Sequence, residues 1–198
     1  MKQTAKLLPN ELTAVIPAAG KIPESVLTLT NVKSPALIPV AGRPVIDWTI
    51  RYLRQLGVEN FVIAVSETGT FLEDFVECSF GDDLNIEFVV PERDGGVGFT
   101  LLELLRRVQT RGSLVVLGDT HFEFNDASDL FRDSPYVLTG AVQESKRWCI
   151  AKLNEEGLVE SLHDKETNLP GPLNALIGVY GFPSTTDALE AAEDAANQ

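Results

Sequence analysis

The sequence predicts a three-layer α/β/α fold, in which helices cover both faces of a mixed, mostly parallel sheet that carries an antiparallel extension. Apolar runs of strand length alternate with helical patterns through the first two thirds of the 198 residues. That order is typical of parallel strands joined by helical crossovers. After residue 134, four strand-like runs follow one another with no helical pattern between them, which indicates antiparallel strands.

The first part of the chain supplies the parallel strands and their helices. A strand is expected over residues 13–17 ("TAVIP"), and a helix over 44–57, where Pro44 suits the first turn and Gly57 the end. Apolar residues recur on one face of that helix, at Ile46, Ile50, Leu53 and Leu56. The other expected elements are strands at 60–66, 85–90 and 113–118 and helices at 71–79 and 101–108.

The second part supplies the antiparallel extension and a final helix. Strands are expected at 136–142, 148–153, 158–163 and 175–182, with the turn "NEEG" between the second and the third. A helix follows over 184–198, with Ser184 and Asp187 as a capping pair. We therefore expect a single domain, residues 1–198, and the sequence leaves open that it is the N-terminal part of a longer protein.

Composition and charge narrow the class of function. Hydrophobic residues make up 44% and charged residues 23% of the chain, as in ordinary soluble domains. The net charge of −13 argues against nucleic acid or an anionic membrane as a partner, because both are polyanions. No apolar run has the length of a membrane span, and the N-terminus lacks a signal-peptide pattern, so a cytoplasmic location is expected. Cys78 and Cys149 are too few for a disulfide framework or a zinc site.

The topology indicates where a ligand binds. In open parallel sheets, ligands lie beyond the carboxyl ends of the strands, and here the loops at those ends begin at Pro17, Ser66, Pro91 and Asp119. The first loop is long and contains Gly20, whose main chain can approach a phosphate. Three cations lie near it, Lys21, Lys33 and Arg43. The alternative for each is an ordinary surface position, which is the more usual one for a lone lysine.

Two acidic positions are candidates for ligand contacts. Asp119 closes the strand at 113–118 and is a candidate Mg²⁺ ligand, because Mg²⁺ binds one or two carboxylates together with phosphate oxygens. A turn or helix-capping aspartate is the alternative. Asp164 and Lys165 are adjacent and can bind a sugar hydroxyl and a phosphate, or form a simple surface charge pair.

In order along the chain, these pieces resemble the sugar-phosphate nucleotidyltransferases, also called NDP-sugar pyrophosphorylases. That family opens with a strand followed by A-A-G-x-G-T-R, then a stretch ending in P-L-T, then P-K-x-L-x-P-V-x-G-x-P and a helix. The matching segments here are "AVIPAAGK", "LTLTNV" and "ALIPVAGRPVIDW". Later family motifs appear as "VVLGDTHF" for G-D, "HDKE" for E-K-P and "LIGVYGF" for G-x-Y. The similarity covers nearly the whole chain and is most specific over residues 31–65.

The resemblance implies a Rossmann-like fold, the cofactor Mg²⁺, and the reaction of an NTP with a sugar 1-phosphate to give an NDP-sugar and pyrophosphate. It also implies roles for particular residues. The implied catalytic residues are Lys21 and Lys33, and the implied metal ligand is Asp119. The implied nucleotide-binding residues are Ala18, Ala19, Gly20 and Gly98, and the implied sugar-phosphate-binding residues are Asp164, Lys165 and Gly178.

The departures from the family pattern fall mostly on ligand-facing motifs. After Gly20 the family's second glycine aligns with Ile22 or Pro23, and its arginine aligns with Glu24 or Ser25. Its P-K pair aligns with Ser34-Pro35, so that lysine is absent. Its G-T-A aligns with 98–100, which puts Phe99 where a small residue is usual, and its R-Y-G aligns with 147–149, which replaces a glycine by Cys149.

Two hypotheses follow, and the sequence does not decide between them. The first is an active nucleotidyltransferase with an unusual loop. The second is a catalytically impaired, degenerate active site that still binds a nucleotide or nucleotide-sugar as a regulatory module. In both, the partners are small-molecule nucleotide and sugar phosphate, and a homo-oligomer or an additional C-terminal domain stays open.

Overall fold

The computed structural model describes residues 6–22, 24, 32–67, 70–92 and 95–196. By its contacts the chain divides into two compact units, one formed by Met1–Tyr136 with Gly181–Gln198, the other by Val137–Tyr180. The single domain expected for residues 1–198 stays a prediction. Within the described residues, no helix is long and apolar enough to cross a bilayer.

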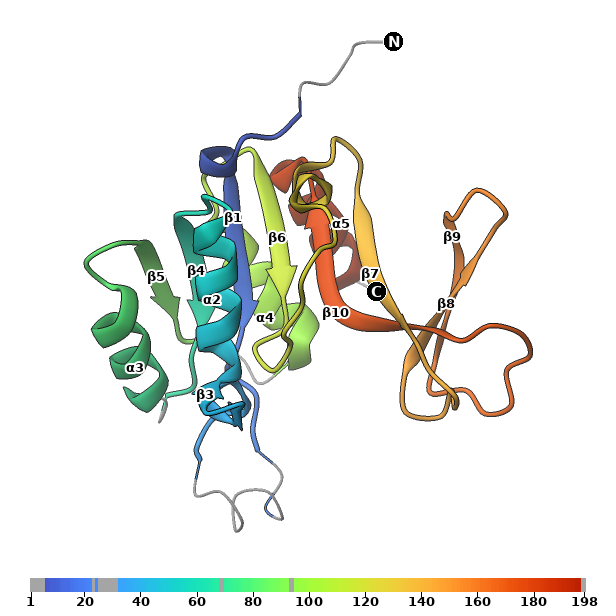
Figure 1. Ribbon diagram of the computed structural model, residues 1–198, viewed down its shortest axis with the longest axis horizontal. Helices are drawn as coiled ribbons and strands as arrows, with labels where there is room; N and C mark the ends of the chain where they lie inside the picture. The colour runs from blue at the N-terminus through green and yellow to red at the C-terminus, as the bar shows by residue number, and fades with distance from the viewer. Residues whose placement is uncertain (1–5, 23, 25–31, 68–69, 93–94, 197–198) are drawn as a thin grey trace. The chain divides into compact units, whose positions relative to one another are not determined.

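The first unit is built on a parallel sheet (Figure 1). Its strands are β1 (Leu12–Pro17), β4 (Asn60–Ala64), β5 (Asn85–Val89) and β6 (Gly112–Val116), in the order β5-β4-β1-β6. The first five residues of β1 and all of β6 are buried, so the continuous apolar runs read from the sequence are the central strands. The register pairs Pro17 with Ala64 and Ala64 with Val89, which brings the carboxyl ends of β1, β4 and β5 level.

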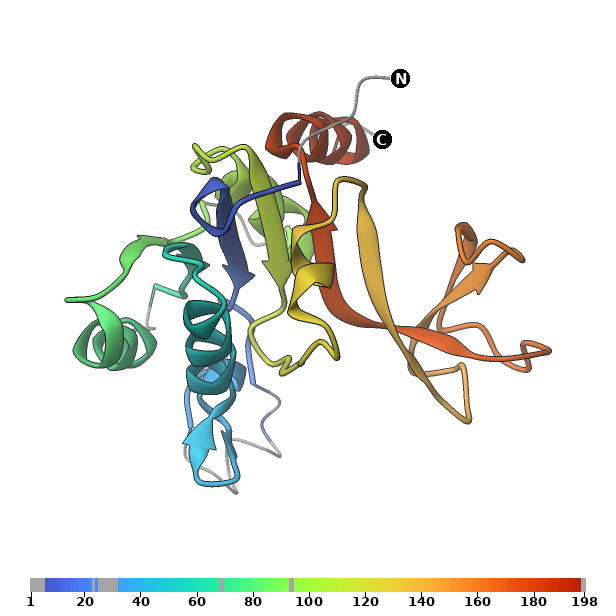
Figure 2. The ribbon, with the colours of Figure 1, turned by 45° about the horizontal axis from the view of Figure 1, so that its top comes forward.

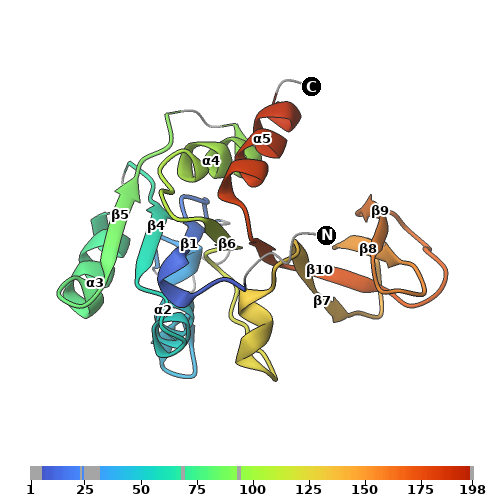
Figure 3. The same ribbon diagram turned by 90° about the horizontal axis from the view of Figure 1, so that it is seen from above.

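Helices cover both faces of this sheet, which confirms the predicted three-layer fold class. They are α2 (Val45–Gln55), α3 (Thr70–Phe80), α4 (Gly96–Leu105) and α5 (Thr185–Ala196). Figure 3 shows α2 and α3 on one face and α4 and α5 on the other. Shorter elements connect them: η1 (Pro9–Glu11), η2 (Pro35–Leu37), η3 (Ala127–Phe131) and the small hairpin of β2 (Pro39–Val40) and β3 (Arg43–Pro44).

The α2 helix has the apolar face and the ends that its sequence predicts, within one or two residues. Ile46, Ile50 and Leu53 are almost completely buried. Pro44 is the N-cap, one position before the first turn. At the other end Gly57 has a φ of +86°, and the Gly57 and Val58 N–H groups donate to the carbonyls of the last helical turn. This Schellman arrangement needs a left-handed residue, which explains the glycine.

The α4 helix differs most from its prediction, since it begins at Gly96 rather than at residue 101. The segment from Gly95 to Gly98 carries no apolar periodicity, and glycine is a poor helix former. The packing of α4 on α5 and β1 involves its later turns, where Leu102, Leu104 and Leu105 are buried, whereas residues 96–98 are exposed. The first turn is supported locally, because the Thr100 hydroxyl donates to the Gly96 carbonyl at 3.3 Å.

The second unit consists of antiparallel strands, as the sequence predicts. They are β7 (Tyr136–Ala141), β8 (Cys149–Leu153), β9 (Val159–Asp164) and β10 (Asn174–Phe182), of which β7 and β10 also contribute end residues to the first unit. Strand β8 pairs antiparallel with both β10 and β9, and Figure 2 shows β8 beside β9. In the predicted turn, the Asn154 side chain accepts the N–H groups of Glu156 and Leu158, and Gly157 has a φ of +79°.

Candidate functional site

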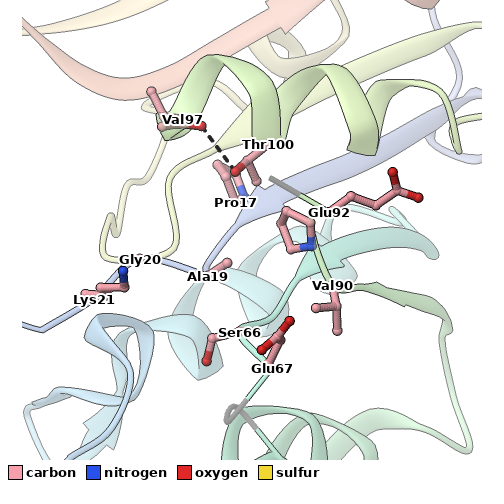
Figure 4. A pocket seen from close by; sticks show the side chains of 12 residues that line it. Pro17, Ala19, Gly20, Lys21, Ser66, Glu67, Val90, Glu92, Val97 and Thr100 are labelled. Atoms are coloured by element: carbon pink, nitrogen blue, oxygen red, sulfur yellow. Dashed lines mark hydrogen bonds between the residues drawn. The ribbon is translucent and has the colours of Figure 1, made fainter. Parts of the chain in front are cut away.

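A cavity of about 600 Å³ lies in the first unit, at the carboxyl ends of β1, β4 and β5 and beside the start of α4 (Figure 4). Three of the four loops that the topology singled out contribute to it, beginning at Pro17, Ser66 and Pro91. The level carboxyl ends of the three strands explain why residues so far apart in sequence share one cavity. Its size suits a small-molecule ligand.

The loop after β1 forms one side of the cavity. Ala19, Gly20 and Lys21 line it, whereas Ala18 is buried and donates its N–H to the Ala64 carbonyl at 3.2 Å. Ala18 is therefore a structural residue, and its predicted contact with a nucleotide stays a prediction. A Cβ at Gly20 would meet no described atom within 4 Å, so packing does not require a glycine there. Because Gly20 has no side chain, only main-chain atoms stand beside the cavity at this position.

Lys21 is the only basic residue among the described residues that line this cavity. Lys33 is directed elsewhere, since its Nζ lies 5.0 Å from the centre of the Phe71 ring. Arg43 pairs with the Asp47 carboxylate at 3.2 Å. Neither Lys33 nor Arg43 is among the residues that line the cavity. The catalytic role predicted for Lys33 is not tested by this geometry.

The Ser34-Pro35 pair, which replaces the family's P-K, has a structural task. Ser34 is buried, and its hydroxyl accepts the Ala36 N–H at 3.3 Å and thereby caps η2. The same hydroxyl donates to the Ala18 carbonyl at 3.5 Å. Ser34 thus links the end of the long segment between β1 and η2 to the start of the loop after β1.

Two glutamates line the cavity, and sequence reasoning missed both of them. Glu67 directly follows Ser66 and Glu92 directly follows Pro91, so the only available signal was their position one and two residues past a predicted strand end. Both side chains are exposed. With Lys21 they give the lining a formal charge of minus one, which is unusual for a cavity expected to hold phosphates.

The start of α4 forms the opposite side. Gly96, Val97 and Thr100 line the cavity, whereas the predicted Gly98 does not. The Phe99 ring packs against Gly95 and is not among the lining residues, so it does not occupy the cavity. The Glu103 carboxylate accepts the Glu92 N–H at 3.1 Å and holds the neighbouring loop against this helix. Val90 and Val97 are both about half exposed and give the cavity its apolar surface.

Asp119 does not line this cavity, but the turn that carries it packs against the loop after β1. A Cβ on Gly118 would lie 2.7 Å from the Ala18 Cβ, so only glycine allows this approach. On the other side of Asp119, the buried Thr49 hydroxyl donates to the Thr120 carbonyl at 2.9 Å. Asp119 itself is exposed. The position is therefore held from both sides, next to the candidate phosphate loop.

The sequence predicts a single metal ligand, Asp119. Among the residues that the structure describes, no group of three or more His, Cys, Asp or Glu side chains could hold a metal ion. Mg²⁺ in phosphoryl-transfer sites is bound by one or two carboxylates plus substrate oxygens and water. Asp119 can supply one such carboxylate. In the same loop, the His121 ring packs against Trp48 and the Phe122 ring against Tyr52.

The remaining predicted residues belong to the second unit. Asp164 is the last residue of β9 and pairs with Cys149 of β8. The pKa of the Cys149 thiol is raised, mainly by burial and to a smaller extent by the negative charge of Asp164. Lys165 has a φ of +54° and donates its N–H to the Trp148 carbonyl at 3.0 Å. Gly178 has a φ of +85°, which favours glycine. Their binding of a sugar phosphate stays a prediction.

Several aligned positions cannot be placed. Pro23, Ser25 and the segment 27–31 of the "LTLTNV" motif lie outside the described residues. Ile22 and Glu24 are described, and the Glu24 side chain is exposed.

Comparison with known proteins confirms the resemblance to the sugar-phosphate nucleotidyltransferases at low identity. No family model matches the chain. A D-glycero-alpha-D-manno-heptose 1-phosphate guanylyltransferase of Campylobacter jejuni is 22% identical over 145 residues, which are 73% of this chain and 64% of that protein. A glucose-1-phosphate thymidylyltransferase of Streptomyces griseus is 24% identical over 174 residues, 82% of this chain and 47% of the relative. The chain thus spans about half to two thirds of the length of these relatives.

Solved structures share the fold. A UDP-glucose pyrophosphorylase complexed with UDP-glucose has a TM-score of 0.75 at 18% identity, covering 91% of this chain and 78% of that one. The protein HddC of Yersinia pseudotuberculosis, complexed with GMP-PN, has a TM-score of 0.69 at 18% identity, covering 90% of this chain and 79% of that one. At such identities the likeness establishes the Rossmann-like nucleotidyltransferase fold. It does not assign the substrates of those proteins to this chain.

Proposed function

We propose that this chain is a nucleotidyltransferase that joins an NTP and a sugar 1-phosphate to give an NDP-sugar and pyrophosphate. The observation that carries the proposal is the cavity at the carboxyl ends of β1, β4 and β5, with Gly20 and Lys21 on one side. It lies where the fold places ligands. The relatives named as guanylyl- and thymidylyltransferases support the same class of reaction.

In the proposed reaction an oxygen of the sugar phosphate attacks the α-phosphorus of the NTP. The bond from the α-phosphorus to the bridging oxygen breaks, and pyrophosphate leaves with that electron pair. Catalysis of this kind depends on positioning and on neutralising phosphate charge. Lys21 supplies positive charge beside the main chain of Gly20, and in this proposal Asp164, Lys165 and Gly178 bind the sugar phosphate.

Asp119 is the residue that we propose as the Mg²⁺ ligand. A bound Mg²⁺ contributes neutralisation of phosphate charge, which the acidic lining of the cavity makes more necessary here. The task of this chain is to hold the Asp119 carboxylate in position through Gly118 on one side and Thr120 on the other.

A second candidate function is a nucleotide- or nucleotide-sugar-binding regulatory module that does not turn over. A specific observation favours it, namely that Lys33 and Arg43 contact Phe71 and Asp47 while Glu67 and Glu92 line the cavity. Loss of one group that stabilises transition-state charge costs about 10²–10³ in rate. In both candidates we propose a cytoplasmic protein whose partners are small molecules, either as a homo-oligomer or with a further C-terminal domain.

The experiment is pyrophosphate release from a panel of NTPs and sugar 1-phosphates with Mg²⁺, alongside calorimetric titration of the same nucleotides. Turnover at ordinary rates, about 1–10³ per second, that is lost in Lys21→Ala supports the enzyme. Binding without turnover supports the regulatory module. If no nucleotide or nucleotide-sugar binds, both proposals are wrong.

A further inference from the structure

The Glu67 carboxylate is a group that a phosphate-binding cavity does not need. It follows β4, lines the cavity, and makes no side-chain hydrogen bond or ion pair with any of the described residues. In Figure 4 its carboxylate lies between Ser66 and Val90, whereas the Glu92 carboxylate points away from Gly20 and Lys21. A carboxylate repels phosphate, so this part of the cavity suits a portion of the ligand that donates hydrogen bonds.

The strand order locates that portion of the ligand. Strand β4 is the parallel neighbour of β1, with Pro17 level with Ala64, and adjacent strands lie about 5 Å apart. If the phosphates of a ligand lie at Gly20 and Lys21, the group that is bonded directly to those phosphates lies at the end of the neighbouring strand, β4. In a nucleotide that group is the pentose.

The hydroxyls of a ribose match this carboxylate chemically. The vicinal 2′- and 3′-hydroxyls are two donors at a spacing that one carboxylate can accept, and an acidic residue on the strand next to a phosphate loop serves this purpose in dinucleotide-binding folds. A 2′-deoxyribose offers only one of the two donors. Beyond the pentose, the half-exposed Val90 and Val97 provide the apolar surface that a flat base requires.

We propose that Glu67 binds the ribose hydroxyls of the nucleotide and makes this cavity selective for ribonucleotides over 2′-deoxyribonucleotides. The inference rests on the proposed nucleotide-binding function and extends it to the class of sugar in the nucleotide. It concerns binding alone and applies to the enzyme and to the regulatory module alike.

The test compares matched pairs of ligands that differ by one hydroxyl. Dissociation constants are measured by calorimetry for UDP against 2′-deoxy-UDP and for GDP against 2′-deoxy-GDP, on the full chain under one set of Mg²⁺ conditions. Hydrogen bonds to charged groups have energies that correspond to about a tenfold to hundredfold difference in affinity. We expect both ribonucleotides to bind more tightly by about that factor.

Glu67→Ala should reduce the ratio within each pair to about one. Glu92→Ala is the matched control, because it removes the same charge from the same cavity and should leave the ratio unchanged. The ratio is the informative quantity, since loss of a negative charge can strengthen phosphate binding of both members of a pair equally. Glu67 is exposed, so thermal unfolding should be unchanged in its variant.

The possible outcomes separate this inference from the proposed function. If no nucleotide binds, the proposed function and the inference both fail. If nucleotides bind and wild type does not distinguish ribose from deoxyribose, only the inference fails. It also fails if Glu67→Ala keeps the ratio, if Glu92→Ala loses it, or if Glu67→Ala changes the preference among bases and not among sugars.

Discussion

The close approach of Gly118 to the loop after β1 allows a quantitative prediction. A Cβ at this position would lie 2.7 Å from the Ala18 Cβ and 3.0 Å from the Ala18 Cα. Carbon atoms in favourable contact are about 3.5–4.0 Å apart, so Gly118→Ala creates an overlap of about 1 Å. Both partner atoms belong to a buried residue next to β1, and neither can move away by a rotamer change.

Overpacking of this kind costs about 1–3 kcal/mol of folding free energy. For a chain of this length each kcal/mol lowers Tm by about 2–4 °C, so we expect a decrease of about 2–12 °C for Gly118→Ala. The measurement is thermal unfolding followed by circular dichroism or calorimetry. Because the shifted loop carries Gly20 and Lys21, nucleotide affinity measured by calorimetry should fall as well.

Gly20→Ala is the matched control, since it adds the same methyl group to the same loop where no described atom lies within 4 Å. We expect its Tm to be unchanged or slightly higher, because replacement of glycine restricts the unfolded chain. Its nucleotide affinity should nevertheless fall, because the added Cβ stands beside the cavity. An unchanged Tm for Gly118→Ala, or equal destabilisation of both variants, would refute the reasoning.

Three further predictions concern the metal, the support of its loop and pH. Asp119→Asn should abolish Mg²⁺-dependent pyrophosphate release while nucleotide binding without Mg²⁺ persists, and retention of full activity would exclude Asp119 as the metal ligand. Thr49→Val should cost about 1–3 kcal/mol in urea unfolding because it removes the buried hydroxyl that donates to the Thr120 carbonyl. Thr49→Ser keeps that hydroxyl and should cost less, and a larger loss in Thr49→Ser than in Thr49→Val would show that the methyl group matters more than the hydroxyl. Burial raises the pKa of Tyr136, whose hydroxyl donates to the Leu130 carbonyl. The unfolded chain therefore loses the Tyr136 proton at a lower pH than the folded chain does, and the free energy of unfolding should fall as the pH rises above about 10. In Tyr136→Phe this fall should be smaller. An identical pH profile in the two proteins would contradict the role given to Tyr136.

Most of the fold could be predicted because local sequence determines local structure. Buried parallel strands require continuous apolar runs, and an amphipathic helix requires apolar residues at every third or fourth position, so β1, β6 and α2 could be recognised directly. The first turn of α4 could not, because the segment from Gly95 to Gly98 is rich in glycine, has no apolar periodicity and is exposed in the folded chain.

The candidate site could be predicted only in part. Its location follows from topology, since parallel strands present their carboxyl ends at one edge, and Pro17, Ser66 and Pro91 all border the cavity. The charge of the residues that line the cavity could not be predicted in the same way, because Glu67 and Glu92 look like ordinary surface residues when each is considered alone.

By itself the sequence determined the order of the strands and helices, three of the loops that border the cavity, and the resemblance to the nucleotidyltransferases. Only the tertiary structure decided which charged groups stand together, directing Lys33 to Phe71 and bringing Glu67 into the cavity with Lys21. The physical reason is that periodicity is a property of neighbouring residues. The distance between side chains on different strands depends on register and packing, which no single segment encodes.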